Sequence, residues 1–254
     1  TMRDHLKGIA DVASDFVGKA EARVLDIGCN DGTLLFSYPD AFVKFGVDPS
    51  DIAREISGGI TVIQDTFPSH ELNGLIADRR FDIVTSIAMF YDLENPVDFV
   101  EQVKAILSEE GIWIFEVSYM PAMLAMNSYD TICHEHLEYY SFSVIENLMQ
   151  RCGMKVVKVE FNSINGGSIR CYVTHVSNFK FKSRENQQTL AQVRQQEFDL
   201  ELDTDKPYKN FQDRINRHKE ELSGLLKALK REGKKIHIYG ASTKGNTILQ
   251  WCGL

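Results

Sequence analysis

The sequence lacks the features of several broad protein classes. It has five cysteines among 254 residues, and they form no Cys-x-x-Cys pair. An odd number of scattered cysteines argues against a disulfide framework or a structural zinc site, and favours reduced thiols in the cytoplasm. No apolar run approaches the roughly 20 residues of a membrane-spanning helix, and the first residues lack the apolar core of a signal peptide. We therefore expect a cytoplasmic protein with no membrane partner.

Positive charge is also scarce. The chain carries 28 Lys and Arg against 36 Asp and Glu, a formal net charge of −8. Proteins that bind nucleic acid normally present a basic surface, so we predict a small-molecule substrate and no nucleic-acid partner. The hydrophobic fraction of 43% is that of a globular protein with a substantial core. This length suits one α/β domain and a smaller extension.

Strand and helix patterns alternate along the first half of the chain. A helical pattern at 3–20 precedes the first strand, and another occupies 96–107. Strands that alternate with helices predict crossover connections and a doubly wound parallel sheet, with ligands at the carboxyl ends of the strands. The predicted strands of this part lie at 24–27, 42–47, 60–64, 81–87 and 111–117.

The second half of the chain departs from this alternation. A loop rich in Met, Tyr and His follows the fifth strand, and we expect a substrate-binding insertion near 118–142. We predict a first domain at 1–180, and at 181–254 a helical linker with the start of a second, truncated α/β unit. The predicted elements are a helix at 143–152, antiparallel strands at 155–161 and 168–176, two helices within 183–232 divided at 203–207, and a strand at 234–239.

The most informative motif is the turn after the first strand. That strand ends at Asp26, the turn contains Gly28 and Gly32, and Asp48 ends the second strand twenty-two positions after Asp26. Glycines let the backbone approach a ligand closely, and a carboxylate at the second position holds ribose hydroxyls. The spacing is not the Gly-x-Gly-x-x-Gly of dinucleotide sites, and Asp26 and Asp31 would repel a phosphate. We therefore expect a nucleoside-bearing cofactor without phosphate.

This turn resembles the first motif of class I S-adenosylmethionine (SAM) methyltransferases. The resemblance implies SAM as cofactor and a seven-stranded Rossmann-like sheet. It places Asp65 against the adenine amino group, although Asp65 could equally cap a helix before Pro68. We interpret Cys29 as a space-filling residue rather than a nucleophile. The implied cofactor-binding residues are Asp26, Gly28, Cys29, Asn30, Gly32, Asp48, Pro49, Asp65, Thr66 and Ser86.

A second motif, His134-Glu135-His136, follows the fifth strand. Together with the stretches 165–170 and 239–247, it resembles the sugar C-methyltransferases that act on nucleotide-linked keto-sugars. Carbon next to a ketone becomes nucleophilic after loss of a proton, and histidine titrates in the right range to take it. The resemblance implies His136 as the catalytic base and Glu135 as its acidic partner. In an extended segment His134 would face the same way as His136.

The chain also departs from that family. The residues present lack its four-cysteine zinc module and most of its C-terminal domain, and Cys133 stands where members have a tyrosine. Tyr91, after the fourth strand, could supply the missing hydroxyl. O-methylation of a sugar or another small metabolite, and a SAM-binding fragment without activity, remain as alternatives. His134 and His136 could instead belong to a solvated loop, and we expect no metal site.

Overall fold

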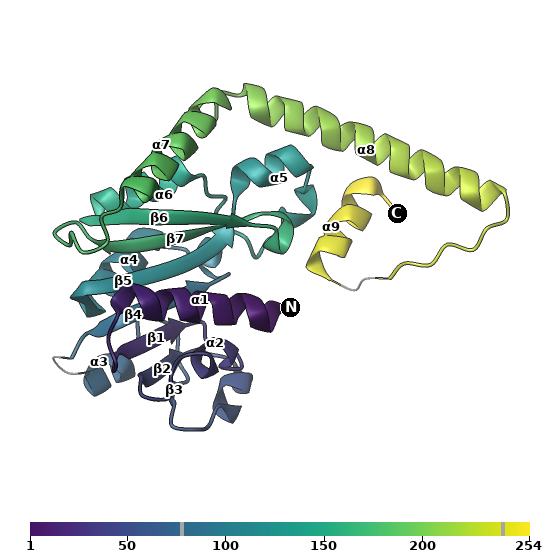
Figure 1. The fold of residues 1–254 in the computed structure, drawn as a ribbon. Helices are drawn as coiled ribbons and strands as arrows, with labels where there is room; N and C mark the ends of the chain where they lie inside the picture. Colours follow the sequence, from purple (N-terminus) through teal and green to yellow (C-terminus); the bar gives the residue numbers. More distant parts are fainter. Residues whose placement is uncertain (77–78, 240–241) are drawn as a thin grey trace.

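The computed structural model describes residues 1–76, 79–239 and 242–254. In these residues one sheet has the strand order β3-β2-β1-β4-β5-β7-β6 (Figure 1). The pairs from β3 to β5 are parallel, and β7 runs antiparallel to both β5 and β6, as predicted. The strands are β1 (Arg23–Ile27), β2 (Val43–Val47), β3 (Thr61–Ile63), β4 (Phe81–Ile87), β5 (Leu107–Ser118), β6 (Met154–Asn162) and β7 (Ser168–His175).

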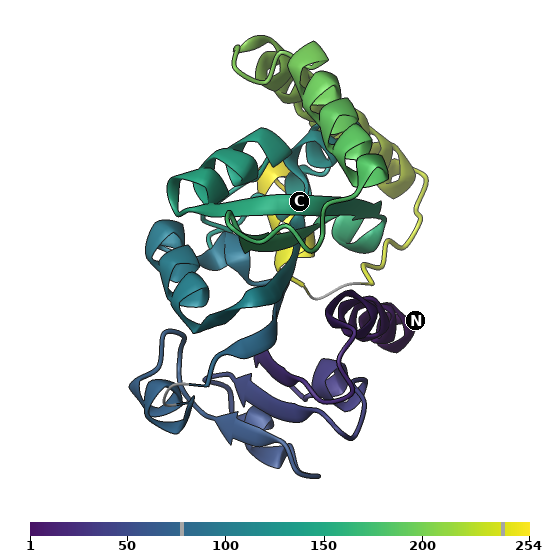
Figure 2. The ribbon, with the colours of Figure 1, turned by 60° about the vertical axis from the view of Figure 1, so that its left-hand side comes forward.

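Helices cover both faces of this sheet (Figure 2). Helix α1 packs on one face, whereas α4 and α6 pack on the other. The helices are α1 (Met2–Val17), α2 (Thr33–Phe36), α3 (His70–Ile76), α4 (Pro96–Ile106), α5 (Met120–Met126), α6 (Phe142–Arg151), α7 (Arg184–Asp199), α8 (Lys206–Arg231) and α9 (Thr243–Cys252); short 3-10 turns include η2 (Phe90–Asp92) and η3 (Tyr129–Thr131).

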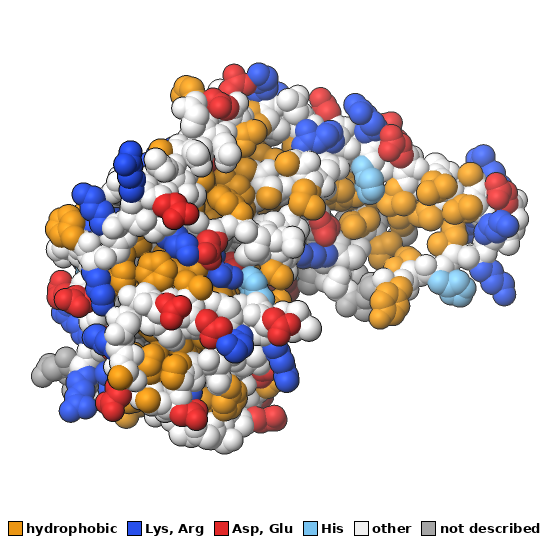
Figure 3. Space-filling view, in the orientation of Figure 1, with side chains coloured by type: hydrophobic (Ala, Val, Ile, Leu, Met, Phe, Trp, Pro, Cys, Tyr) orange, Lys and Arg blue, Asp and Glu red, His pale blue; other side chains and the backbone are white. Residues whose placement is uncertain are grey.

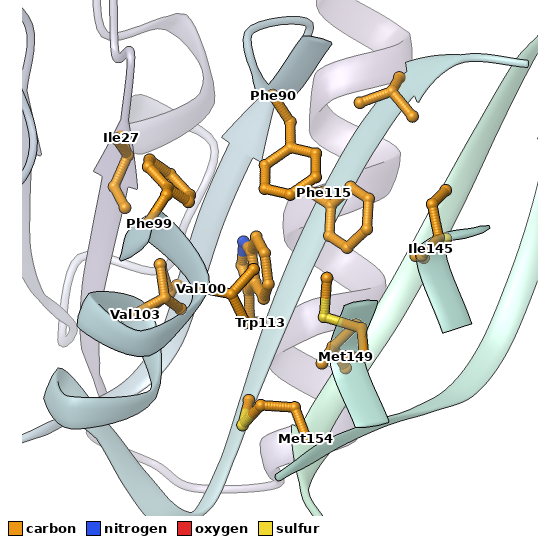
Figure 4. Close-up of a cluster of buried hydrophobic side chains, with 14 of the residues drawn as sticks. Ile27, Phe90, Phe99, Val100, Val103, Trp113, Phe115, Ile145, Met149 and Met154 are labelled. Carbon is orange, nitrogen blue, oxygen red and sulfur yellow. The ribbon is translucent and has the colours of Figure 1, made fainter. Parts of the chain in front are cut away.

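The alternation of side chains along β5 builds both cores. Trp113 and Phe115 pack with Phe90 and Phe99 on the α4 and α6 face (Figure 4), while Ile114 points to the α1 face. Residues two apart in a strand share a face, so a central strand covered on both sides reads as an unbroken apolar run. The rings meet mostly edge-on or tilted, which suits their quadrupoles.

One predicted strand is wrong. Residues 234–239 form an extended segment without strand pairing, although Lys-Lys-Ile-His-Ile-Tyr alternates as a strand would. A strand needs a neighbour for its backbone groups, and within the described parts of the chain this segment pairs with none; Ile238 is 67% exposed. Of the predicted motif at 239–247, Gly240 and Ala241 lie outside the described residues. Helix α9 follows and packs on η3 and α8.

Helix α7, the first helix after the sheet, packs directly on it. Leu190 and Val193 of α7 join the larger core, and α7 lies against β6 and α6. Helix α8 extends beyond the sheet (Figure 1) and contacts α5 and α9. None of the helices in the described part of the chain is both long and apolar enough to cross a membrane.

Candidate active site

The turn after β1 curves over the carboxyl edge of the sheet. Gly28 and Gly32 have φ angles of 78° and 75°, and Asn30 has a φ of 48°. This left-handed region strains most side chains, while glycine adopts it freely and asparagine tolerates it. The Gly28 amide donates to the Val47 carbonyl at 2.8 Å, which draws the turn toward the end of β2. The backbone therefore forms a tight corner at the position where the sequence predicts the cofactor.

Asp48 links this turn to β2. Its carboxylate accepts hydrogen bonds from the amide of Asn30 at 2.9 Å, from the amide of Ser50 at 2.8 Å, and from the Ser50 hydroxyl. A carboxylate has about four acceptor positions, so the fixed side chain retains capacity for a hydroxyl donor. The structure thus brings Asp48 and the glycine turn together as the spacing predicted.

The side chains of Asp26 and Cys29 are buried beneath the backbone of this turn. The Thr85 hydroxyl donates to Asp26 at 2.6 Å, and burial raises the pKa of Asp26 to about 7. Burial also raises the pKa of the Cys29 thiol to about 12, which makes it unreactive. A Cβ on Gly46 would lie 2.6 Å from the Cys29 sulfur. Cys29 fills the space that the missing side chain of Gly46 leaves.

The remaining predicted cofactor residues lie along the same edge. Pro49 and Thr66 are exposed, and the half-buried Asp65 accepts a hydrogen bond from the Thr66 amide at 2.8 Å. Asp65 does not cap the following helix. The Ser69 hydroxyl does so instead, because it accepts a hydrogen bond from the Leu72 amide in the first turn of α3. The buried Ser86 hydroxyl accepts from the Trp113 indole at 3.0 Å.

A short path connects the turn to the His-Glu-His motif. Met89 Cγ lies 3.5 Å from the position of a Cβ built on Gly28. Two residues later, the Tyr91 ring lies 4.6 Å from the His136 ring, measured between centroids. The Tyr91 carbonyl also accepts hydrogen bonds from the amides of Leu137 and Glu138, each at 3.0 Å. The structure therefore brings Tyr91 and His136 together next to the cofactor corner.

The environment of His136 determines its tautomer. Its Nδ1 lies 2.8 Å from the carbonyl oxygen of Thr131. A carbonyl can only accept, so Nδ1 carries the proton in the neutral ring and Nε2 keeps a free lone pair. Burial raises the pKa of the neighbouring Tyr91 hydroxyl to about 12, so Tyr91 stays a neutral donor. This arrangement suits proton abstraction by Nε2.

The segment before His136 is a turn rather than the extended chain considered above. The His136 amide donates to the Cys133 carbonyl at 3.3 Å, and the side chains of His134 and Glu135 are 87% and 58% exposed. Glu135 accepts a long hydrogen bond of 3.4 Å from the Thr243 hydroxyl of α9. His134 and Glu135 therefore face α9 and solvent instead of flanking His136.

A cleft of about 620 Å³ separates this turn from α9. One wall comes from the His-Glu-His segment and the other from the first two turns of α9 and its tryptophan. The lining mixes hydroxyl, amide and aromatic groups, which suits a polar ring-shaped ligand. Its residues are Ile132, Cys133, His134, Thr243, Asn246, Thr247, Gln250 and Trp251.

A buried charge cluster lies at the end of β5, and it was not predicted from the sequence. Glu116 accepts from Arg170 Nε at 2.9 Å and Asn162 Nδ2 at 3.0 Å, and lies 2.8 Å from His5 Nε2 of α1. Its backbone carbonyl accepts from the Ala88 amide at 2.8 Å, just after β4. A buried charge requires partners. The single glutamate within the apolar run of β5 was therefore the one sign in the sequence of a buried charge cluster. The cluster fixes α1 over the edge that carries the site.

Family models cover almost the whole chain. Residues 3–159 match the model described as a methyltransferase domain, and residues 163–254 match the C-methyltransferase C-terminal domain.

Among curated relatives, the C-methyltransferase NovU of Streptomyces niveus is 28% identical over 98% of this chain. The tRNA U34 carboxymethyltransferase of Colwellia psychrerythraea is 33% identical over 42% of this chain. The chain spans 60% of the length of the first relative and 34% of the second.

Among solved structures, the plantazolicin methyltransferase BpumL in complex with a triazolic desmethylPZN analog and SAH superposes with a TM-score of 0.51. It is 15% identical, and the match covers 67% of this chain and 83% of that one. At this identity the likeness concerns the fold, and it confirms the predicted Rossmann-like arrangement.

Proposed function

The chain belongs to the methyltransferase-domain family, and we propose that it methylates a carbon of a nucleotide-linked keto-sugar with His136 as the base. The cofactor of this methyltransferase domain is SAM, as the first motif predicted. Carbon as the acceptor draws support from the match of residues 163–254 to the C-methyltransferase C-terminal domain. The sugar draws support from the sequence resemblance described above.

The residues at the carboxyl edge fit such a cofactor. Asp48 would hold the ribose hydroxyls, and Asp65 the adenine amino group. The turn from Gly28 to Gly32 would pass close to the amino-acid part, where buried Asp26 favours a cation over a phosphate. When bound, SAM supplies an electrophilic methyl group on a positively charged sulfur.

The hydrogen bond from His136 Nδ1 to the Thr131 carbonyl is the single observation that carries the proposal. It holds the ring in one tautomer, so that Nε2 can accept the proton from the carbon next to the ketone. The imidazolium that forms keeps the same hydrogen bond, which strengthens as the ring becomes charged. Tyr91 is a neutral hydroxyl close to His136, and we assign it the stabilisation of the enolate oxygen.

The cleft between the His-Glu-His turn and α9 is our candidate for the nucleotide of the substrate, because His136, which the sugar must reach, is not among its lining residues. Asn246 and Gln250 offer amide groups, and Trp251 offers an aromatic face to a ring. An acidic chain with a net charge of −8 is a poor match for tRNA. The tRNA-modifying relative, moreover, matches 42% of the chain.

Product analysis tests this function. Incubation with SAM carrying a ¹³C-methyl group and a panel of nucleotide-linked keto-sugars should give a methyl resonance typical of carbon attachment. We expect His136→Gln to lose the product, and His70→Gln, at the exposed start of α3, to retain most of it. A methyl resonance typical of attachment to oxygen would overturn the proposal in favour of O-methylation. Tight binding of S-adenosylhomocysteine without turnover on any sugar would indicate a binding fragment.

A further inference from the structure

One buried carboxylate contacts both ends of the segment that carries His136. Glu197 of α7 is 3% exposed. Its Oε1 accepts from the Tyr119 hydroxyl at 2.8 Å and from the Phe142 amide at 2.5 Å, and its Oε2 accepts from the Ser143 amide at 2.8 Å. Tyr119 directly follows β5, while Phe142 and Ser143 begin α6. The carboxylate thus joins the entry and the exit of the segment 119–143.

The physical setting makes these contacts strong. The first amides of a helix lack partners within the helix, and the positive end of its dipole attracts an anion. Burial raises the pKa of the Tyr119 hydroxyl well above its usual range, which keeps it a proton donor to Glu197. Three donors therefore replace the water that the buried carboxylate has lost, and hydrogen bonds to a charge are the stronger kind.

The interior of the segment is fixed separately. The Met120 amide donates to the Tyr140 carbonyl at 2.9 Å, which closes the segment into a loop. His136 is then held by the Thr131 carbonyl, and the amides after it by the Tyr91 carbonyl. Glu197 thus holds the two ends of the segment, and these inner hydrogen bonds hold its middle next to Tyr91.

We propose that Glu197 is a positioning residue that holds the His136 segment in register with the cofactor turn. The proposal rests on the proposed function for the catalytic meaning of His136, whereas its structural part stands on the contacts alone. On this proposal α7, which follows the sheet in the sequence, contributes a positioning residue to the active site.

Three variants separate positioning from simple helix packing. Glu197→Gln removes the charge at nearly constant size, and Tyr119→Phe removes one contact while leaving the α6 amides bonded. Arg194→Gln is the matched control, because Arg194 pairs with Glu146 across the same two helices at 2.6 Å and makes no hydrogen bond that holds the segment ends to Glu197; its guanidinium lies over the Phe142 ring at 5.9 Å. Hydrogen exchange of residues 129–138 and ¹⁵N chemical shifts of the His136 ring are the readouts, and neither needs a substrate.

We expect amide exchange in 129–138 to accelerate about ten- to hundred-fold in Glu197→Gln, as befits loss of a charged hydrogen-bond acceptor. Tyr119→Phe should show a smaller change in the same direction, and Arg194→Gln none. The His136 ring should shift from one tautomer to a mixture in Glu197→Gln, with S-adenosylhomocysteine affinity by calorimetry unchanged.

Equal effects of Glu197→Gln and Arg194→Gln, or unchanged exchange in Glu197→Gln, would overturn the positioning role. Full turnover by His136→Gln would instead overturn the proposed function, and it would leave the exchange result intact. The two failures are therefore distinguishable.

Discussion

At the scale of single residues, Asp26 shows how burial changes the chemistry of a motif position. Its carboxyl group is buried with the Thr85 hydroxyl as a partner, and its pKa rises from 3.8 to about 7. A folded-state pKa above the unfolded value means that the folded state binds the proton more tightly. Its contribution to stability is therefore present below pH 4 and is lost as the pH rises through 7.

We predict that Asp26→Asn removes this pH dependence. The melting temperature of the wild-type protein should fall more steeply between pH 5 and 8 than that of the variant, since the amide does not ionise. Thermal unfolding of both proteins across this range, without cofactor, measures the difference. Parallel curves would show that Asp26 keeps an ordinary pKa.

Gly46→Ala should destabilise the protein by about 1–3 kcal/mol, because overpacking a tight site displaces its neighbours. The new Cβ would lie 2.6 Å from the Cys29 sulfur and 3.0 Å from Leu35 Cδ1. Gly8→Ala in α1 is the matched control, since nothing lies within 4 Å of its Cβ position. Denaturant unfolding measures both. A second substitution, Cys29→Ala, should recover part of the loss if the sulfur contact is responsible.

At the scale of elements, the charge cluster of Glu116 determines how α1 packs on the sheet. Glu116→Gln would leave buried Arg170 without its closest anion, and we predict a loss of about 3 kcal/mol in the free energy of unfolding. The exposed pair Arg80–Glu109 is the control. Its variant Glu109→Gln should change stability by less than about 1 kcal/mol. Equal effects of the two variants would show that the buried cluster is not an anchor.

The strands and the cofactor turn could be predicted from sequence because their signals are local. An apolar run followed by glycines identifies β1, and a fixed spacing from Gly28 locates Asp48. The ends of elements were less accurate, since β5 begins at Leu107 rather than at 111. The pattern of 234–239 predicted a strand, but pairing depends on a neighbour that the local sequence does not specify.

The non-local parts of the site could not be predicted in the same way. The contact between Tyr91 and His136 joins residues forty-five positions apart, and depends on where two loops meet. Glu197 lies on a helix rich in charged and polar residues, so the local sequence does not distinguish this buried glutamate from the exposed ones around it. The Thr131 carbonyl that fixes the His136 tautomer is a backbone atom, for which no residue type is diagnostic.

At the scale of the whole molecule, the cofactor site and the cleft depend on different parts of the chain. The cofactor corner is built from residues 23–89, whereas α9 forms one wall of the cleft. Exposed apolar and basic side chains accumulate along α8 and the segment after it (Figure 3). The division near residue 180 stays a prediction.

A chain shortened after Arg231 tests this separation. We predict that it still binds S-adenosylhomocysteine, because α9 packs chiefly on η3 and α8, while binding of the nucleotide-sugar falls at least about ten-fold with the wall removed. Calorimetry with each ligand measures both affinities. Simultaneous loss of cofactor binding would show that the two parts form one unit.

The most direct measurement on His136 is exchange of the substrate proton with solvent. Wild-type protein, S-adenosylhomocysteine and a nucleotide-linked keto-sugar are incubated in D₂O, and deuterium at the carbon next to the ketone is followed by NMR. A base at Nε2 predicts exchange in the wild type, and a decrease of about 10²- to 10⁴-fold in His136→Gln. Undiminished exchange in that variant, or methyl transfer without any exchange in the wild type, would contradict the role of His136 as the base.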